Sequence, residues 1–154
     1  MKTFIVFMAF VLIFVSFMCY FSDMSDYIRL QGRLKVLAED CAAGAALLTD
    51  DDLYSRGYLV IDQTAAQELV QTMLEETCRS SVFFSGCTLT AELVIYDDEK
   101  GWFGCSRYGI EPGIPCAAAT VTCSGRDLFR LPFITRTSCS RTATYSWHKR
   151  EVMP

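Results

Sequence analysis

Cysteine is the residue type with the greatest chemical potential in this chain, which has eight cysteines among 154 residues. Cys19 lies in an apolar amino-terminal segment, and the other seven follow it. So many thiols in a short chain predict either disulfides, formed in an oxidising compartment, or a structural metal site. Structural zinc sites use cysteines separated by two to four residues. This spacing is absent here, so disulfides are the favoured interpretation.

Seven thiols cannot all pair within one chain, so at least one is free or pairs between chains. Cys41 lies on an apolar helical stripe, where a free cysteine behaves as a small apolar residue, and we expect it to be the unpaired one. The other six allow fifteen connectivities, which the sequence does not distinguish. These six disulfide candidates are Cys78, Cys87, Cys105, Cys116, Cys123 and Cys139.

No arrangement of residues in the sequence predicts catalysis. The chain lacks the G-x-S-x-G, H-E-x-x-H, P-loop and C-x-x-C patterns. A cysteine–histidine nucleophile would need His148, the only histidine, which stands beside Lys149 and Arg150 and is expected on the surface. We therefore expect no enzymatic activity, no cofactor and no metal ligand.

Acidic and aromatic residues offer weaker binding alternatives. The runs at 50–52 and 97–99 are interpreted as solvated turns, with Thr49 as the cap of a short helical turn, and the first run lacks the order of a calcium loop. Trp102, Phe103 and Tyr108 favour packing over a binding patch. A net charge of −4 without a basic cluster argues against a nucleic-acid partner. A small-molecule ligand is not expected either.

The elements that position these residues begin with an apolar helix. Residues 4–21 carry no charge, and eighteen helical residues span roughly 27 Å, close to the hydrocarbon thickness of a bilayer. We therefore expect residues 1–21 to be a transmembrane helix. The alternative is a cleaved signal peptide, but no A-x-A-like cleavage site follows the segment.

Residues 22–48 continue the same helix without proline and carry an apolar stripe. This stripe either packs on the chain's own strands or faces a second subunit, and both interpretations stay open. Gly44→Leu distinguishes the two interpretations. If the stripe faces a second subunit, the substitution should disrupt assembly and leave the outer domain folded. If the stripe is core, the outer domain should unfold. The candidate assembly face consists of Leu30, Leu34, Leu37, Cys41, Gly44, Ala45 and Leu48.

The flanking charges and the cysteines disagree about membrane orientation. Only Lys2 precedes the apolar segment, whereas Arg29, Arg33 and Lys35 follow it, which favours a cytoplasmic carboxyl side. The cysteine content favours the opposite side, and pairing of Lys35 with Glu39 one helical turn away offsets part of the positive charge. We expect a cytoplasmic amino terminus and an extracytoplasmic domain.

Residues 49–154 have the pattern of a small α+β domain held by disulfides. The spacing of apolar residues predicts an amphipathic helix over 63–77, capped by Asp62. Alternation then predicts strands in an antiparallel sheet. The expected β segments are 81–85, 88–96 in a hairpin with 102–103, 117–124, an edge strand over 128–134, and 137–148. Because the helices precede the strands, the fold class is α+β.

The run Phe4–Phe21 followed by LQGRLKVLAEDCAAGAALL over 30–48 resembles the amino-terminal region of pilins and pseudopilins. It is most similar to the TadE-like minor pilins of Tad (Flp) pilus and related secretion systems. The resemblance implies a membrane-retained structural component whose partners are other pilin-like or secretion-apparatus subunits or further copies of itself. The apolar run has no glutamate, which pilins carry five positions into the mature chain, so we expect an unprocessed subunit.

A second function stays open from a different class. A membrane-tethered or secreted disulfide-stabilised domain can also serve as a binding module for a ligand or partner protein. Its recognition surface would then be the loop at 104–115, rather than the helix at 28–48.

Overall fold

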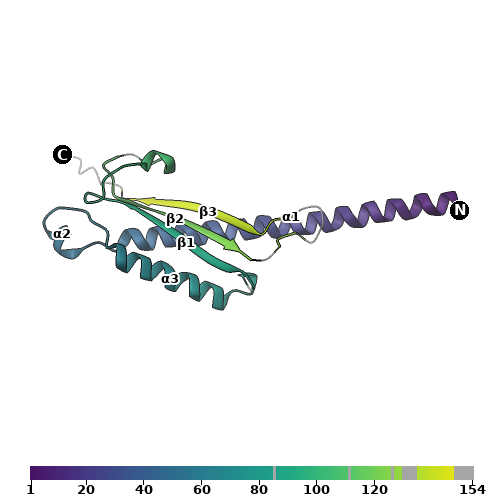
Figure 1. Cartoon of the computed structure of the whole chain (residues 1–154), viewed down its shortest axis with the longest axis horizontal. Helices are drawn as coiled ribbons and strands as arrows, with labels where there is room; N and C mark the ends of the chain where they lie inside the picture. Colours follow the sequence, from purple (N-terminus) through teal and green to yellow (C-terminus); the bar gives the residue numbers. More distant parts are fainter. Residues whose placement is uncertain (85, 111, 126, 130–134, 148–154) are drawn as a thin grey trace, which may run out of the picture.

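The longest element of the computed structural model is α1, one continuous α-helix over Lys2–Leu47. The structure describes residues 1–84, 86–110, 112–125, 127–129 and 135–147. The predicted continuity of the apolar segment with the amphipathic segment is confirmed. The amino-terminal half of α1 projects beyond the rest of the chain (Figure 1).

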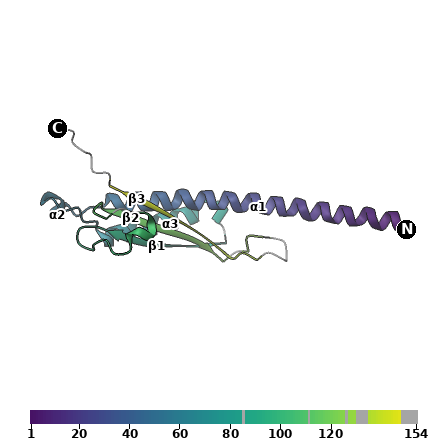
Figure 2. The same cartoon turned by 90° about the horizontal axis from the view of Figure 1, so that it is seen from above.

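Three antiparallel strands form one sheet beside the carboxyl-terminal half of α1. They are β1 (Thr88–Tyr96), β2 (Cys116–Ser124) and β3 (Ser138–Ser146), in the order β1–β2–β3. The central strand β2 pairs along its whole length with both neighbours. Figure 2 shows the sheet and α1 as adjacent layers, so the α+β architecture is as predicted.

Alternation along β2 divides its side chains between the two faces of the sheet. Residues 117, 119, 121 and 123 lie in the main core, which also contains the buried side of α1. Alanines occupy the first two of these positions, so the helix can approach the strand closely. The core therefore combines a small-residue helix face with a small-residue strand face.

The helix α3 (Gln63–Ser80) completes the helical layer and packs against α1 and β1. The Asp62 carboxylate accepts hydrogen bonds from the Thr64 and Ala65 N–H groups at 2.9 and 3.1 Å, which confirms the predicted cap. The buried side chains of α3 are Ala66, Val70 and Leu74.

A short helix, α2 (Asp51–Ser55), lies between α1 and α3. Its cap is Asp50, whose carboxylate accepts from the Asp52 and Leu53 N–H groups at 2.9 and 3.2 Å. The prediction that Thr49 caps this turn is wrong. Thr49 instead forms an isolated antiparallel bridge with Ile61, which leaves the neighbouring aspartate free to act as the cap.

Other β predictions differ from the structure in informative ways. The run 81–85 contains a 3₁₀ turn, η1 (Val82–Phe84), rather than a strand. No strand resumes at 102–103, because β1 pairs with β2 across a long excursion instead of forming a short hairpin. The last strand ends at Ser146. Most of the predicted edge strand at 128–134, and His148, lie outside the described residues.

The turn after β1 is anchored by a buried acid that the sequence suggested was solvated. Asp97 is 0 % exposed. Its carboxylate accepts N–H groups from Ile61 at 3.2 Å, Glu99 at 3.2 Å and Lys100 at 2.8 Å. These bonds fix the turn to the chain segment that enters α3.

Candidate assembly and binding surfaces

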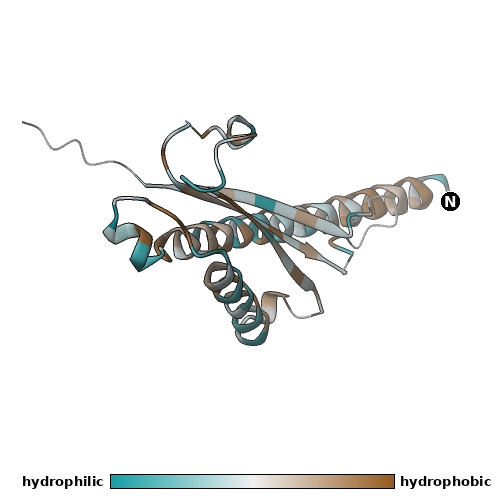
Figure 3. Cartoon of the chain, turned by 60° about the vertical axis from the view of Figure 1, so that its left-hand side comes forward, coloured by the Kyte–Doolittle hydropathy of each residue, from teal (hydrophilic) through white to brown (hydrophobic). Residues whose placement is uncertain are grey.

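The projecting half of α1 presents apolar side chains on every side. Almost all side chains over residues 4–21 are exposed, and the most apolar 18-residue window of the helix has none of its residues buried. Figure 3 shows this half as a continuous hydrophobic segment. By length and composition, α1 is one helix that can cross a membrane.

The folded domain begins to cover α1 immediately beyond this segment. Asp23 is 3 % exposed, and the Tyr27 and Phe129 rings pack with their centroids 5.6 Å apart. Farther along, the Arg33 guanidinium lies 4.5 Å from the centre of the Phe83 ring. The uncovered part of α1 therefore ends close to residue 22, near the boundary predicted from the sequence.

The predicted assembly face lies inside the molecule. Its members Leu34, Cys41 and Ala45 are 0 % exposed, and Leu30 and Leu37 are also buried. The face is covered by β2, β3 and α3 of the same chain. Of the two interpretations that the sequence left open, this burial favours packing within the chain: the stripe is apolar because it forms the core.

The remaining two members of that stripe are partly buried and also face the chain's own elements. A Cβ added at Gly44 would meet Leu69 Cδ2 of α3 at 3.0 Å. Leu48 packs against the main core. Gly44→Leu is therefore a test of folding rather than a test of assembly, because its side chain would enter the contact between α1 and α3.

The opposite side of α1 carries a different, exposed apolar strip. Ile28, Val36 and Leu47 are 60, 56 and 61 % exposed, and a Cβ at Gly32 would meet nothing within 4 Å. We call these four residues the outer face of α1. Lys35 and Glu39 flank it as the predicted ion pair, with Nζ and Oε1 3.6 Å apart.

The cysteines on the strands and their adjoining loops fall into two groups on opposite faces of the sheet. Cys105 and Cys116 lie together in a small cluster with Tyr96, whereas Cys123 and Cys139 are buried in the main core beside Cys87. All eight cysteines are free thiols in the structure. The predicted disulfides are not formed, and the pairing of these residues stays a prediction.

Burial keeps several of these thiols protonated. It raises the pKa of Cys41 to about 11, with a smaller contribution from the charge of Asp40. Burial also raises the pKa of Cys116 to about 11, and Cys105 adds to this shift. The pKa of Cys123 rises to about 12, first through burial and then through Cys87. None of these three is an activated nucleophile, because the thiolate is the reactive form.

No metal centre is formed by the residues that the structure describes: they contain no group of three or more His, Cys, Asp or Glu side chains arranged to hold an ion. The acidic run at 50–52 serves the helix cap described above. In the second acidic run, the Asp98 carboxylate accepts the Leu59 N–H at 3.2 Å. Both runs therefore have structural roles.

The loop at 104–115, proposed as a recognition surface, folds over the face of the sheet that points away from α1. Its 3₁₀ turn, η2 (Cys105–Tyr108), is flanked by Gly104 and Gly109 at positive φ angles of 82° and 70°, which glycine adopts without strain. Trp102 and Tyr108 pack on the small cluster, as the packing interpretation predicted. Phe103, however, is 99 % exposed.

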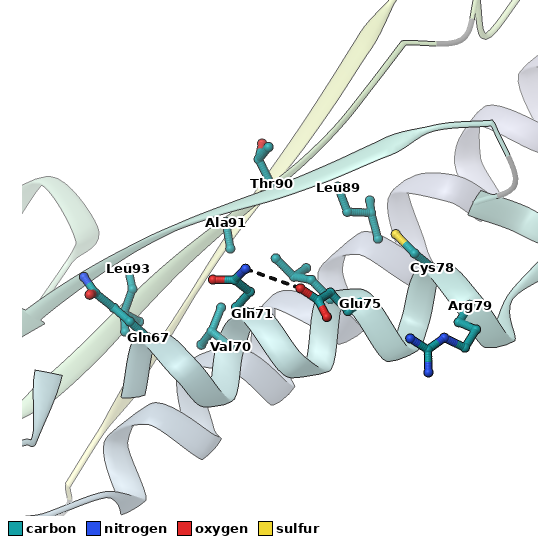
Figure 4. Close-up of a pocket in the computed structure, with 11 residues that line it drawn as sticks. Gln67, Val70, Gln71, Glu75, Cys78, Arg79, Leu89, Thr90, Ala91 and Leu93 are labelled. Atoms are coloured by element: carbon teal, nitrogen blue, oxygen red, sulfur yellow. Dashed lines mark hydrogen bonds between the residues drawn. The ribbon is translucent and has the colours of Figure 1, made fainter. Parts of the chain in front are cut away.

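A groove between α3 and the edge strand β1 forms a concave surface with a volume of about 780 Å³. Figure 4 shows Val70, Leu89 and Leu93 among its lining residues, with the Gln71 amide donating to Glu75 Oε1 at 3.3 Å. The sequence did not indicate this groove, because it depends on the angle between α3 and the sheet. Its apolar floor and polar rim suit an extended peptide or an apolar ligand.

Comparison of the chain with protein-family models, with curated proteins and with solved structures finds no match. Its function is therefore argued from its own surfaces. These are an exposed apolar half-helix, the outer face of α1 and the groove beside β1.

Proposed function

We propose that the protein is a single-pass, membrane-anchored structural component of a pilin-like assembly. The observation that carries the proposal is the double use of α1: its first half is apolar and uncovered, and its second half is the core helix of the folded domain. A rigid helix of this kind holds the domain directly against the bilayer. The same division of one helix between membrane and domain underlies the resemblance to minor pilins and pseudopilins.

The outer face of α1 is the assembly surface in this proposal. It continues the exposed side of the anchor into the region outside the bilayer, so two subunits that pack side by side in the membrane can extend their contact along it. Gly32 has open space above it, which permits close approach of a second helix backbone. Ile28 and Val36, one turn before and one turn after this glycine, supply apolar area.

Membrane retention and self-association test this proposal on the full chain. Two copies with different tags should remain in the membrane pellet after alkaline extraction and be isolated together from detergent extracts. Val36→Glu should abolish joint isolation without changing membrane retention. Glu76→Lys, on the exposed side of α3, is the matched charge-changing control and should leave joint isolation unchanged. Equal joint isolation of both variants would contradict the assembly role of the outer face.

The groove beside β1 favours a second function, a membrane-tethered binding module. Among the strands that the structure describes, the edge strand β1 pairs only with β2, so an extended peptide can add to its other edge while its side chains enter the groove. Gln71→Arg, at the exposed rim, should then impair ligand capture. The outer-face variant Val36→Glu should have no effect on capture, which separates the two functions.

The orientation in this proposal places the amino terminus in the cytoplasm and the domain outside. The number of thiols supports an oxidising compartment. Addition of a membrane-impermeant tag to an engineered site at Thr64, on the exposed start of α3, tests it in intact cells. Labelling without permeabilisation supports the proposed orientation, and labelling only after permeabilisation contradicts it.

A further inference from the structure

We propose that the domain matures through three disulfides, which join Cys78 to Cys87, Cys105 to Cys116 and Cys123 to Cys139, and that Cys41 remains a thiol. This inference rests on the extracytoplasmic placement in the proposed function. It selects one of the fifteen connectivities that six cysteines allow. The selection comes from the sheet, which separates the thiols by face and by strand.

The two faces of the sheet assign the first bond. Cys116 and Cys123 are seven positions apart on β2, an odd spacing that places their side chains on opposite faces. Cys116 lies with Cys105 in the small cluster on the face of the sheet that points away from α1. Both are buried, and Cys105 is the only thiol that acts on the pKa of Cys116. The remaining four cysteines lie on the helix-facing side, so Cys105 pairs with Cys116.

The strand register assigns the second bond. Cys123 on β2 is directly opposite Cys139 on β3. Directly opposed residues in antiparallel strands have Cα atoms about 4.5 or 5.5 Å apart, and both distances lie within the range of about 4.4–6.8 Å that a disulfide spans. Both side chains are buried in the main core. The Cα separation of this pair therefore suits a disulfide.

Cys87 is the competing partner, since its thiol lies within hydrogen-bonding reach of Cys123. It precedes β1, and the residue opposite Cys123 on that strand is Leu89, so Cys87 is a diagonal neighbour of Cys123 rather than its direct register partner. A bond between Cys87 and Cys123 would also leave Cys78 and Cys139 to each other. They lie on α3, which packs on β1, and on β3, which is two strands away.

The third bond follows for the remaining pair. Cys78 and Cys87 also lie close enough to Cys123 to raise its pKa, and once Cys123 has paired with its register partner Cys139 these two are left to pair with each other. Cys78 lies in the last turns of α3, and η1 returns the chain from there to Cys87 at the start of β1. Cys78 lines the groove next to Leu89, the second residue of that strand. The bond between Cys78 and Cys87 would link the end of α3 to the start of β1.

Each bond forms by loss of two S–H bonds and gain of one S–S bond. The two protons pass to solvent and the two electrons to a disulfide oxidant, either a dithiol–disulfide oxidoreductase or glutathione disulfide, which is reduced to two thiols. Attack requires a thiolate, and burial keeps Cys116 and Cys123 protonated in the folded chain. Both thiols are also buried away from any oxidant, so we expect oxidation to precede closure of the core.

Mapping of the freed thiol in single-cysteine variants tests this connectivity. Full-length protein is trapped with an alkylating reagent in cells, denatured without reductant and digested with trypsin. Wild type should show two alkylated thiols, Cys19 and Cys41. Cys123→Ser should free Cys139 and so add one alkylated thiol on the tryptic peptide 137–141. Cys116→Ser should free Cys105 and add one alkylated thiol on the peptide 101–107. Cys78→Ser should add one on 80–100. An added thiol on 80–100 in Cys123→Ser would overturn the assignment.

A second measurement distinguishes a wrong disulfide connectivity from a wrong location of the domain relative to the membrane. Eight alkylated thiols in wild-type cells would overturn disulfide maturation and the extracytoplasmic placement together, while joint isolation of tagged copies would still report on assembly. The pairing is then judged after refolding the reduced, unfolded full chain in detergent with glutathione disulfide. Where a serine variant fails to accumulate, Cys123→Ala with Cys139→Ala should retain the other two bonds. Loss of either bond there contradicts the scheme.

Discussion

The Trp147 indole N–H donates to the carbonyl oxygen of Ala46 at 2.8 Å, across 101 residues of sequence. Ala46 lies in the last turn of α1, where helix carbonyls lack an intrahelical partner. Trp147 follows β3 and packs on the main core. This bond ties the residue that follows the last strand to the carboxyl-terminal end of α1 and so holds that end of the sheet on the helix.

Trp147→Phe should lower the free energy of unfolding by about 1 kcal/mol, because it removes the donor and leaves a partly buried carbonyl unpaired. Urea unfolding of the full chain in detergent, followed by near-ultraviolet circular dichroism, measures the change. Tyr145→Phe, at an exposed side chain of β3, is the control and should change stability by less than about 0.5 kcal/mol. Equal effects would show that the bond to Ala46 does not stabilise the domain.

The two glycines of α1 should respond in opposite directions to larger residues. Gly32→Ala should stabilise the chain by about 0.5–1 kcal/mol, since alanine is the better helix former and the added Cβ meets nothing. Gly44→Leu should destabilise it by about 1–3 kcal/mol through overpacking against Leu69. Thermal unfolding in detergent compares both. A Gly44→Leu variant as stable as wild type would contradict the packing of α1 on α3.

Asp97→Ala should cost about 2–4 kcal/mol, because three backbone N–H groups lose one buried acceptor. The matched control is Asp98→Ala. Its exposed carboxylate accepts one N–H group, so the loss should stay below about 1 kcal/mol. Urea midpoints of the two variants test the difference. Equal losses would mean that burial of the first carboxylate contributes nothing.

The buried Cys41 thiol should make the folded chain less stable at alkaline pH. Burial holds its pKa near 11, above the ordinary 9.0, so the unfolded chain releases this proton first as the pH rises. Its stabilising contribution is complete below pH 9 and is lost between pH 9 and 11, by about 2–3 kcal/mol. Urea unfolding of the oxidised full chain at pH 8 and 10.5, for wild type and Cys41→Ala, isolates the effect. The variant should lose less stability than wild type, and parallel losses would exclude Cys41 as the cause.

Local periodicity in the sequence was sufficient to place the main elements. The uncharged run at 4–21, the proline-free stretch after it and the spacing in 63–77 predicted α1 and α3 to within a few residues. Alternation predicted β1 and β2 equally well. These patterns depend on neighbouring residues alone, so no tertiary information was needed.

What covers each apolar face could not be predicted in the same way. The stripe from Leu30 to Leu48 has one periodicity whether it packs on a sheet or on another subunit, and only the fold shows that β2, β3 and α3 cover it. Asp97 looked solvated because its partner Ile61 is 36 positions away. The groove beside β1 likewise depends on how α3 lies on the sheet.

Photo-cross-linking at two positions of α1 tests the division of this helix most directly. A photoreactive residue replaces Phe10 or Val36 in the full chain in native membranes, and the adducts are identified by mass. We expect lipid adducts at Phe10, in the uncovered apolar half, and protein adducts with a second subunit at Val36. Absence of lipid at Phe10 would contradict the anchor. Val36 adducts that contain lipid or water alone would contradict assembly through the outer face.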